Sequence, residues 1–288
     1  MQKCMAGMPA SCMDRETSAE QASLMHRHEF LTLLASAGAS LGVGACAAPV
    51  TTAMAPPGRP APGSRPKLRA ICFDLFTLFD PRFVVTVARG LVGEQAPALC
   101  DAWRSRQFEY GFLRAAAGQY QDFRAVTAQA LDYAVRSQQL SLTPEQRETL
   151  VAAYSQLEPW PDTRQQLGAF QRAGLRLAPL ANYSPRMLSE LLAHAQLEPF
   201  FAAQISTDAA RSFKPDPRAY ALGVSTLKLA REEIAFAAFG GWDAAGARWF
   251  GYPTFWVNRL GVTPEALAPG PDASGPTLAE LAQFVAGW

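Results

Sequence analysis

The sequence predicts an α/β fold in which a parallel, doubly wound sheet carries helices on both faces and an inserted all-helical stretch. The 288 residues are 49% hydrophobic and 18% charged, which is typical of a globular chain long enough to bury a substantial core. Beyond residue 160, helical and strand patterns alternate at the lengths of strand–helix units. Before that point, several helical patterns follow one apolar strand with no second strand between them.

The first strand is predicted at residues 68–73, an apolar run closed by Asp74 and suited to burial on both faces. The helical patterns that follow cover residues 96–117, 123–135 and 144–154. Thr143, Pro144 and Gln146 form a strong helix start, with a capping residue, a proline in the first turn and the partner of a capping box. We expect this region to be an all-helical insertion.

The second part of the chain alternates regularly. Helices are predicted at residues 162–173, 185–195, 217–227, 244–250 and 278–286. Strands are predicted at residues 175–180, 203–206, 234–239 and 254–257. Because sequential strands joined by helices pair in parallel, their carboxyl ends should meet at one rim, where ligands of such sheets bind.

Residues 1–48 have the pattern of a signal segment for export. Arg27 and His28 precede a mildly apolar run, residues 30–45, that is too short and too rich in small residues for a good transmembrane helix. The run ends at Cys46, and the tetrapeptide before and including it resembles a bacterial lipobox. We therefore expect a bacterial, exported protein, either periplasmic after cleavage near Ala48 or a membrane-anchored lipoprotein with a lipid at Cys46.

Residues 49–66 are predicted to be a proline-rich linker, since the stretch APPGRPAPGSRP cannot form a helix or a sheet core. Five of the 26 basic and four of the 25 acidic residues lie in residues 1–66, so the remainder is neutral. A neutral body gives no support for binding nucleic acid. The five cysteines do not make a disulfide scaffold. Beyond the signal segment only His194 remains, so we expect no metal and no cofactor.

Charged and polar side chains follow the predicted strands. Asp74 comes directly after the first strand, Asn182 after the second and Asp243 after a later one, while Lys214 lies in a proline-containing loop. A carboxylate directly after a buried strand needs a partner, and Lys214 is a natural one, which favours a nucleophilic Asp74 held by a cation. The alternatives are a helix cap for Asp74 or Asp243, and a solvated loop lysine for Lys214.

Five segments of the body resemble type II (L-2-)haloacid dehalogenases of the haloacid dehalogenase-like superfamily. They are FDLFTLFD (73–80), WRSRQFEY (103–110), LANYSP (180–185), FKPDPRAY (213–220) and GWDAAGARWFGYPTFWVNR (241–259). The resemblance covers the chain from about Lys67 to Trp288. It implies a Rossmann-like hydrolase core over residues 67–80 and 159–288, with a helical cap over residues 81–158.

The resemblance also implies roles for five residues. Asp74 corresponds to the nucleophile, and Arg104 to the cap arginine that meets the leaving halide and the substrate. Lys214 corresponds to the lysine that neutralises the nucleophile, Asp243 to the carboxylate that holds this lysine and helps to deliver water, and Tyr220 to a tyrosine near the substrate carboxylate. For Arg104, a surface arginine whose stem covers the core is the alternative.

Further residues are implied to bind the substrate. Thr77 and Asn182 correspond to polar positions after the first and second strands. Phe108, Phe123 and Trp242 correspond to positions that line an apolar pocket, and the alternative for these three is ordinary core.

The sequence departs from the family motif D-x-Y-G-T-L, because Asp74-Leu75-Phe76-Thr77-Leu78 is one residue shorter and has lost the glycine. Ala181, Ala238 and Gly240 stand where the family has hydroxyl or amide side chains around the substrate and the water. Each lost donor costs about 1–3 kcal/mol of binding. We expect the loop after Asp74 to be rebuilt.

The function implied is the hydrolysis of short L-2-haloacids to 2-hydroxy acids through an aspartyl ester on Asp74, with a small-molecule 2-haloacid as the partner. Whether the enzyme forms a homodimer stays open. One alternative is a catalytically silent, exported fold that acts as a binding module, motivated by the shortened motif. A phosphatase of the same superfamily is the other, although Phe76 stands where it would need a second acid.

Overall fold

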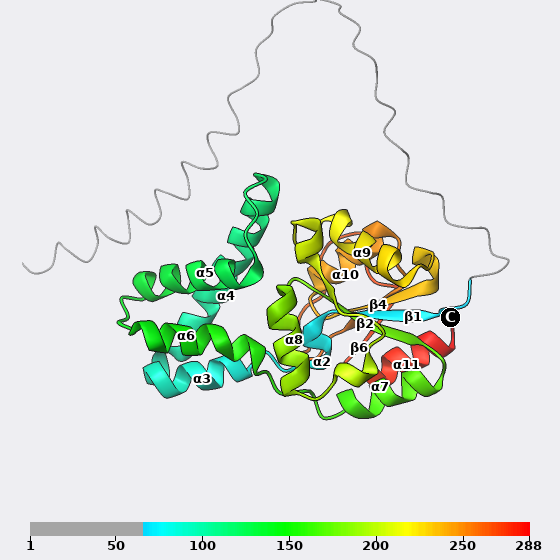
Figure 1. Cartoon of the computed structure of the whole chain (residues 1–288), viewed down its shortest axis with the longest axis horizontal. Helices are drawn as coiled ribbons and strands as arrows, with labels where there is room; N and C mark the ends of the chain where they lie inside the picture. Colours follow the sequence, from blue (N-terminus) through cyan, green and yellow to red (C-terminus); the bar gives the residue numbers. More distant parts are fainter. Residues whose placement is uncertain (1–65) are drawn as a thin grey trace, which may run out of the picture. The chain divides into compact units, whose positions relative to one another are not determined.

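In the computed structural model, which describes residues 66–288, six strands form one parallel sheet in the order β3-β2-β1-β4-β5-β6 (Figure 1). The strands are β1 (Ala70–Phe73), β2 (Arg176–Ala181), β3 (Ile205–Ser206), β4 (Ile234–Ala238), β5 (Thr254–Val257) and β6 (Ala273–Gly275). All five pairings are parallel, as the alternating strand–helix pattern predicts. The predictions for residues 1–65 lie outside the described residues.

Helices cover both faces of the sheet (Figure 1). On one face, the alternate residues Ile71 and Phe73 of β1 belong to a core shared with α7 (Thr163–Arg172), α8 (Pro185–His194) and α11 (Leu278–Ala286). On the other face, Ala70 and Cys72 pack in a core with α9 (Pro217–Leu227) and α10 (Gly241–Phe250). The central strand is therefore buried on both sides, which explains its unbroken apolar sequence.

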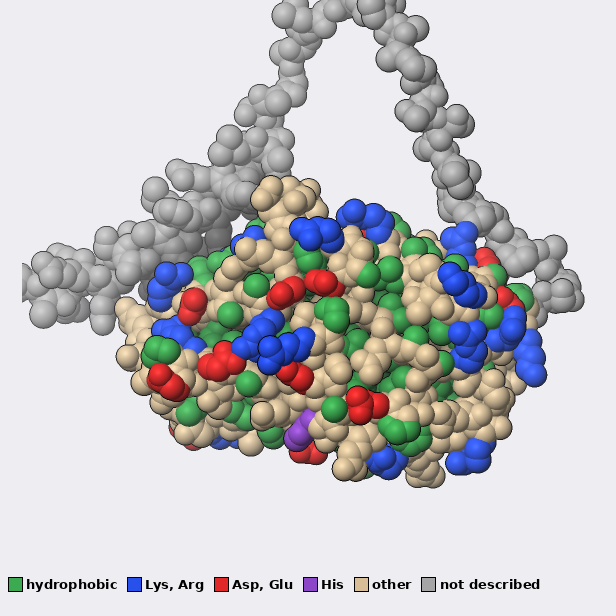
Figure 2. All heavy atoms as spheres, in the orientation of Figure 1, with side chains coloured by type: hydrophobic (Ala, Val, Ile, Leu, Met, Phe, Trp, Pro, Cys, Tyr) green, Lys and Arg blue, Asp and Glu red, His purple; other side chains and the backbone are tan. Residues whose placement is uncertain are grey.

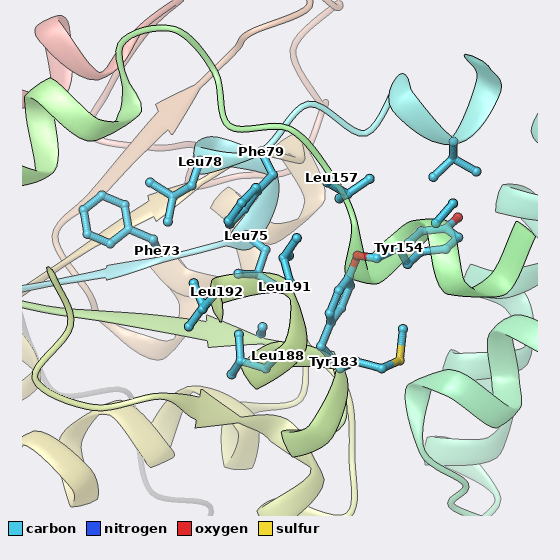
Figure 3. Packing of buried hydrophobic residues seen from close by; sticks show 14 of the residues in the cluster. Phe73, Leu75, Leu78, Phe79, Tyr154, Leu157, Tyr183, Leu188, Leu191 and Leu192 are labelled. Atoms are coloured by element: carbon cyan, nitrogen blue, oxygen red, sulfur yellow. The ribbon is translucent and has the colours of Figure 1, made fainter. Parts of the chain in front are cut away.

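The first of these cores includes the residues that directly follow β1, where the chain leaves the sheet. Figure 3 shows three leucines of α8, Leu188, Leu191 and Leu192, in one cluster with Phe73 at the end of β1 and with Leu75, Leu78 and Phe79, which follow it. These side chains are almost fully buried. The short helix α2 (Leu75–Leu78) is thus anchored on its apolar side by α8, which fixes the backbone just beyond Asp74.

Between α2 and α7 the described chain forms helices only, as predicted. These are α3 (Phe83–Val92), α4 (Ala96–Ala116), α5 (Phe123–Ser137) and α6 (Pro144–Ala152), with short 3-10 turns after α3 and α6. We call Phe83–Ser155 the helical segment. The chain enters and leaves it along neighbouring paths, because Phe79 pairs with Pro159 and the Asp80 amide donates to the Glu158 carbonyl at 2.9 Å.

The predicted start of α6 is confirmed. The Thr143 hydroxyl accepts a hydrogen bond from the Gln146 amide at 3.2 Å, and the Gln146 side chain accepts one from the Thr143 amide at 2.9 Å. The helix predicted at residues 244–250 begins earlier, at Gly241, with Gly240 as its capping residue. Asp243 therefore lies in the first turn of α10, and the alternative of a helix cap for Asp243 is wrong.

Candidate active site

The sheet order explains why distant residues meet. β1 lies between β2 and β4, so Asp74, which follows β1, lies between Asn182, which follows β2, and the loop after β4 that leads to Asp243. Lys214 enters from the connection between β3 and α9. The structure brings Asp74, Lys214 and Asp243 together at the carboxyl ends of the strands, where the sequence predicts them.

Asp74 presents one carboxylate oxygen to each of two neighbours. Its Oδ1 accepts a hydrogen bond from the Phe76 amide at 2.9 Å, and its Oδ2 accepts one from Lys214 Nζ at 2.6 Å. The carboxylate is therefore both the cap of α2 and one member of an ion pair with Lys214. The expected pairing is confirmed, and the alternative of a helix cap for Asp74 is also correct. The side chain is 16% exposed and lines a cavity.

Lys214 lies between two carboxylates. Its side chain is 1% exposed, and Nζ donates to Asp243 Oδ2 at 2.7 Å as well as to Asp74. Burial by itself lowers the pKa of Lys214, but the charges of Asp243 and Asp74 outweigh burial and raise this pKa above its ordinary value. A solvated loop lysine is thereby ruled out, and the ammonium group is a fixed positive charge beside Asp74.

Asp243 lies behind Lys214 rather than at the cavity. Its Oδ1 accepts a hydrogen bond from the Tyr220 hydroxyl at 2.6 Å, and its Oδ2 accepts the one from Lys214. Burial raises the pKa of Asp243 to about 6, against the lowering influence of Lys214. Each oxygen of Asp243 therefore accepts a hydrogen bond, and Asp243 does not line the cavity. In this structure Asp243 holds Lys214 in place.

The cavity has a volume of about 60 Å³ and a mainly apolar wall. Asp74, Arg104, Asn182, Phe108, Phe123 and Trp242 all line it, as expected from the sequence. Phe108 of α4 and Trp242 of α10 contact each other edge to face, with ring centroids 5.2 Å apart. The pocket thus lies between the helical segment and the sheet, and all three rings line it. Phe123 also packs against the first core, so for this ring the pocket role and the core role are both realised.

Arg104 points into this pocket from α4. Its guanidinium carbon lies 4.8 Å from the ring centroid of Phe108 and 5.2 Å from that of Phe76. Aromatic faces favour a nearby cation, so these contacts hold the charged group at the cavity without neutralising it. The alternative of a surface arginine is therefore wrong, and the guanidinium of Arg104 faces the cavity, where it can bind an anion.

Asn182 has its orientation fixed by its amide oxygen. Oδ1 accepts hydrogen bonds from the Lys214 amide at 2.9 Å and from the Thr207 hydroxyl at 3.3 Å. The amide nitrogen is then the group left to face the cavity that Asn182 lines. The same contact ties the loop of Lys214 to the end of β2.

Thr77 and Tyr220 lie elsewhere than expected, because neither lines the cavity. Thr77 is fully buried, and its hydroxyl donates to the Asp74 carbonyl at 2.7 Å. The shorter motif makes a single helical turn, which places residue 77 beneath Asp74 rather than beside its carboxylate. Tyr220 is buried on α9 and directs its hydroxyl to Asp243. Both therefore support the carboxylates instead of contacting a ligand.

Ala181 and Gly240, which the resemblance places near the substrate and the water, also line the cavity. Sequence reasoning missed several other cavity residues: Leu75, Phe76, Gln107, Gly111, Phe112, Val126, Tyr183, Phe213 and Phe239. Tyr183, Phe76 and Phe239 each lie within three residues of a strand end, so their position in the sequence could have indicated them. Figure 3 shows Tyr183 beside Tyr154, whose carbonyl accepts the Tyr183 hydroxyl at 3.1 Å. Phe123 stacks on Tyr183 with centroids 4.9 Å apart.

Among residues 66–288, no three His, Cys, Asp or Glu side chains gather as a metal site would require. Charged groups that face the cavity are those already described, an aspartate and an arginine. An anionic nucleophile, a buried lysine that balances it and a cation on the opposite wall can displace a leaving group from carbon and stabilise the anion released.

Comparisons with known proteins agree with this geometry. A family model described as haloacid dehalogenase-like hydrolase matches residues 68–251. The chain is 37% identical over 206 residues to an (S)-2-haloacid dehalogenase of Pseudomonas sp. strain YL, covering 71% of this chain and 89% of the relative. It is 34% identical over 221 residues to haloacetate dehalogenase H-2 of Moraxella sp. strain B, covering 76% and 99%.

Solved structures show the same similarity. The L-2-haloacid dehalogenase of Xanthobacter autotrophicus superposes with a TM-score of 0.71 at 34% identity, covering 76% of this chain and 99% of the other. A second structure of that protein, with a TM-score of 0.70 and the same identity and coverage, carries chloropropionic acid covalently bound.

Proposed function

Because the chain belongs to the haloacid dehalogenase-like hydrolases, we propose that it hydrolyses short L-2-haloacids to 2-hydroxy acids through an ester on Asp74. The observation that carries the proposal is the state of the Asp74 carboxylate. It lines the cavity, it is held by Lys214 at 2.6 Å, and Arg104 lines the same cavity. The covalent chloropropionic acid in the Xanthobacter enzyme supports an intermediate of this kind.

In the first step, a carboxylate oxygen of Asp74 attacks the carbon that bears the halogen. A carbon–oxygen bond forms, the carbon–halogen bond breaks, and the halide leaves with the bonding electrons. The guanidinium of Arg104 and the amide nitrogen of Asn182 are the cavity groups that stabilise the negative charge of the halide or of the substrate carboxylate. Attack from the side opposite the halogen inverts the configuration at that carbon.

In the second step, water attacks the ester carbonyl of Asp74, and the acyl–oxygen bond breaks to release the 2-hydroxy acid. One proton of the water goes to a base and is then passed to the departing alkoxide oxygen, which becomes the hydroxyl of the product, and the second is released as Asp74 returns to the carboxylate form. Asp243 remains our candidate, since ester formation removes the Asp74 charge and leaves Lys214 with one carboxylate partner. Each oxygen of Asp243 accepts one hydrogen bond, from Tyr220 or Lys214, and keeps a second lone pair that takes up the first proton once the water reaches it.

The helical segment would act as a cap, because residues of α4 and α5 close one side of the cavity. Its position over the strand ends keeps bulk water from the ester until the halide has left. Export of the protein by residues 1–48, with cleavage or a lipid at Cys46, remains part of the same proposal and rests on the sequence pattern.

The experiment is halide release by the purified enzyme from each enantiomer of 2-chloropropionate, without added metal. We expect release from the L enantiomer and formation of the D-hydroxy acid. Asp74→Asn should release no halide, while Asp80→Asn, which changes a partly exposed carboxyl with its own arginine partner, should keep activity.

Wild-type enzyme that releases no halide from any 2-haloacid would refute the proposal and favour a silent binding fold. Release of phosphate from phosphate esters only with Mg²⁺ would instead favour the phosphatase alternative.

A further inference from the structure

The helix that follows the nucleophile is unusually short. A helix leaves its last carbonyl groups without partners inside the helix, and α2 has only four residues, Leu75–Leu78. Within it, the Thr77 amide and hydroxyl both hydrogen bond to the Asp74 carbonyl, at 3.1 and 2.7 Å. The backbone of Asp74 therefore depends on the position of Thr77, and Thr77 depends on whatever satisfies the end of this single turn.

Side chains from outside the turn satisfy it. The carbonyl of Phe76 accepts the Trp160 indole N–H at 3.0 Å, and the carbonyl of Leu78 accepts the Thr163 hydroxyl at 2.8 Å. The carbonyl of Thr77 accepts two bonds from Arg259, from Nη2 at 2.8 Å and from Nε at 3.2 Å. The Leu78 carbonyl also accepts the Trp160 amide at 2.9 Å, whereas Arg259 is the one residue outside the turn that the structure shows donating to the Thr77 carbonyl. Each of the three carbonyls therefore has a partner from outside the turn.

Arg259 is itself held rigidly. Its side chain is 5% exposed, and its Nη1 donates to Asp162 Oδ2 at 3.0 Å. Asp162 Oδ2 also accepts the Leu278 amide at the start of α11, at 2.9 Å. The guanidinium carbon lies 5.2 Å from the centroid of the Trp160 ring. The guanidinium that donates to the Thr77 carbonyl is therefore held by Asp162 and Trp160, and Asp162 is in turn bonded to the start of α11.

From this chain of contacts we infer that Arg259 is a positioning residue for the nucleophile, acting through Thr77 on Asp74. Arg259 does not line the cavity and touches no reacting atom. Its place beyond β5 means that a residue far along the sequence sets the geometry of the turn after β1. The expected effect on kcat rests on the proposed function. The expected effect on the order of the turn at residues 75–79 does not require the protein to be active.

The test compares Arg259→Ala with Arg259→Lys and with the control Arg231→Ala. Arg231 also donates a guanidinium hydrogen bond to a helix-terminal carbonyl, that of Phe250 at 2.8 Å, but at the opposite end of α10 from Asp243. Amide hydrogen exchange of residues 75–79 is measured together with kcat, KM and the melting temperature. Ethylguanidine is added to Arg259→Ala as a chemical replacement for the lost group.

We expect faster exchange confined to residues 75–79 in Arg259→Ala, with kcat lowered on the order of 10- to 100-fold and KM nearly unchanged, because a displacement of about 1 Å weakens attack this much. Ethylguanidine should restore part of kcat. Arg259→Lys should be intermediate, since one ammonium cannot make both bonds to Thr77 while pairing with Asp162.

Unchanged exchange at residues 75–79, or a kcat within about twofold of wild type, would overturn the inference. Exchange that rises throughout the core, as far as it does in the control, would also overturn it, because Arg259 would then be a general stabilising residue. If wild-type enzyme releases no halide, the proposed function fails, and the exchange measurement alone decides the role of Arg259.

Discussion

At Asp243, burial and hydrogen bonds act in opposite directions on one carboxyl group. Burial raises its pKa to about 6, while Lys214 and the Tyr220 hydroxyl lower it. The ionised form is the one that can hold the Lys214 ammonium beside Asp74. Activity should therefore fall on the acidic side of this pKa, as Asp243 takes up a proton.

Tyr220→Phe removes one hydrogen bond that favours the ionised carboxylate. The pKa of Asp243 must then rise, and the acidic limb of the kcat/KM–pH profile should move to higher pH. Tyr252→Phe is the matched control, since the Tyr252 hydroxyl donates to the Tyr220 carbonyl rather than to Asp243. An acidic limb that stays in place in Tyr220→Phe would show that another group governs it.

Lys214→Met leaves two carboxylates near each other with no cation between them. Removal of one partner of a buried ion pair costs about 3–5 kcal/mol, so we expect a large loss of unfolding free energy at neutral pH and no halide release. The pKa of Asp243 should rise further in the variant. A folded-state pKa above the unfolded value gives stability that is present at low pH and lost as pH rises through the folded pKa.

Urea unfolding at several pH values measures this dependence. The difference in unfolding free energy between wild type and Lys214→Met should shrink as pH falls from the raised pKa of Asp243 in the variant toward about 6, the wild-type value. Below that pH Asp243 is protonated in both proteins, and the difference should level off. A difference that is independent of pH would contradict the balance of charges described for Lys214.

The sequence predicts which residues lie at the strand ends, but it does not predict the direction in which each side chain points. Asp74, Lys214 and Arg104 lie as expected, since their positions follow from strand order and from the face of α4. Thr77 and Tyr220 do not, because losing one residue from the turn and the packing of α9 each redirect a side chain. The clamp on α2 by Arg259 joins positions 182 residues apart and has no local pattern.

At the scale of elements, local signals determined how well boundaries were predicted. α9, β5 and α11 match the prediction residue for residue, and α9 begins with a proline while α11 begins with a capping box. α3 was missed, as its FVVTVARGLV sequence is rich in β-branched valine, which favours strands. β6 has only small residues, ASG, and gains its pairing from β5.

A tyrosine links the helical segment to the sheet beside the cavity. Tyr120, between α4 and α5, donates its hydroxyl hydrogen to Asp208 Oδ1 at 2.7 Å and packs against Phe213, with centroids 5.3 Å apart. Phe213 lines the cavity, so this contact closes the pocket at one edge. Burial and the Asp208 hydrogen bond raise the pKa of Tyr120 above its ordinary value, which keeps the donor protonated.

Tyr120→Phe should weaken closure without touching the reacting groups. Loss of about 1 kcal/mol predicts a KM raised by about fivefold, with kcat changed by less than about twofold. Steady-state kinetics with L-2-chloropropionate measure both. Tyr133→Phe is the control, because its ring packs with Arg106 within the helical segment. A KM equal to that of wild type would show that the Tyr120–Asp208 contact does not control closure.

At the scale of the whole molecule, the nearly equal numbers of acidic and basic residues agree with how charged side chains are distributed on the surface. Acidic and basic side chains are interspersed across much of the face drawn in Figure 2, as expected for a nearly neutral body. None of the described helices is long and apolar enough to cross a membrane. The sheet and helical segment enclose the proposed site within residues 66–288, so this part of the chain should fold and act by itself.

Deletion of residues 1–65 tests this independence. We expect a melting temperature close to that of the full chain, since the described residues by themselves supply two hydrophobic cores, one on each face of the sheet. Differential scanning calorimetry of both forms is the measurement. A melting temperature lowered by more than about 4 °C would correspond to a loss of roughly 1 kcal/mol or more and would mean that the removed residues stabilise the fold.

The ester on Asp74 is the central claim, and a single turnover in ¹⁸O-water tests it most directly. With enzyme in excess over L-2-chloropropionate, water attacks the Asp74 carbonyl, so one labelled oxygen stays in the carboxylate and the released 2-hydroxy acid is unlabelled. Mass spectrometry of the peptide that contains Asp74 should then show a gain of one ¹⁸O. Label found in the hydroxy acid instead, with none on Asp74, would mean that water attacks the substrate carbon directly and would contradict the mechanism.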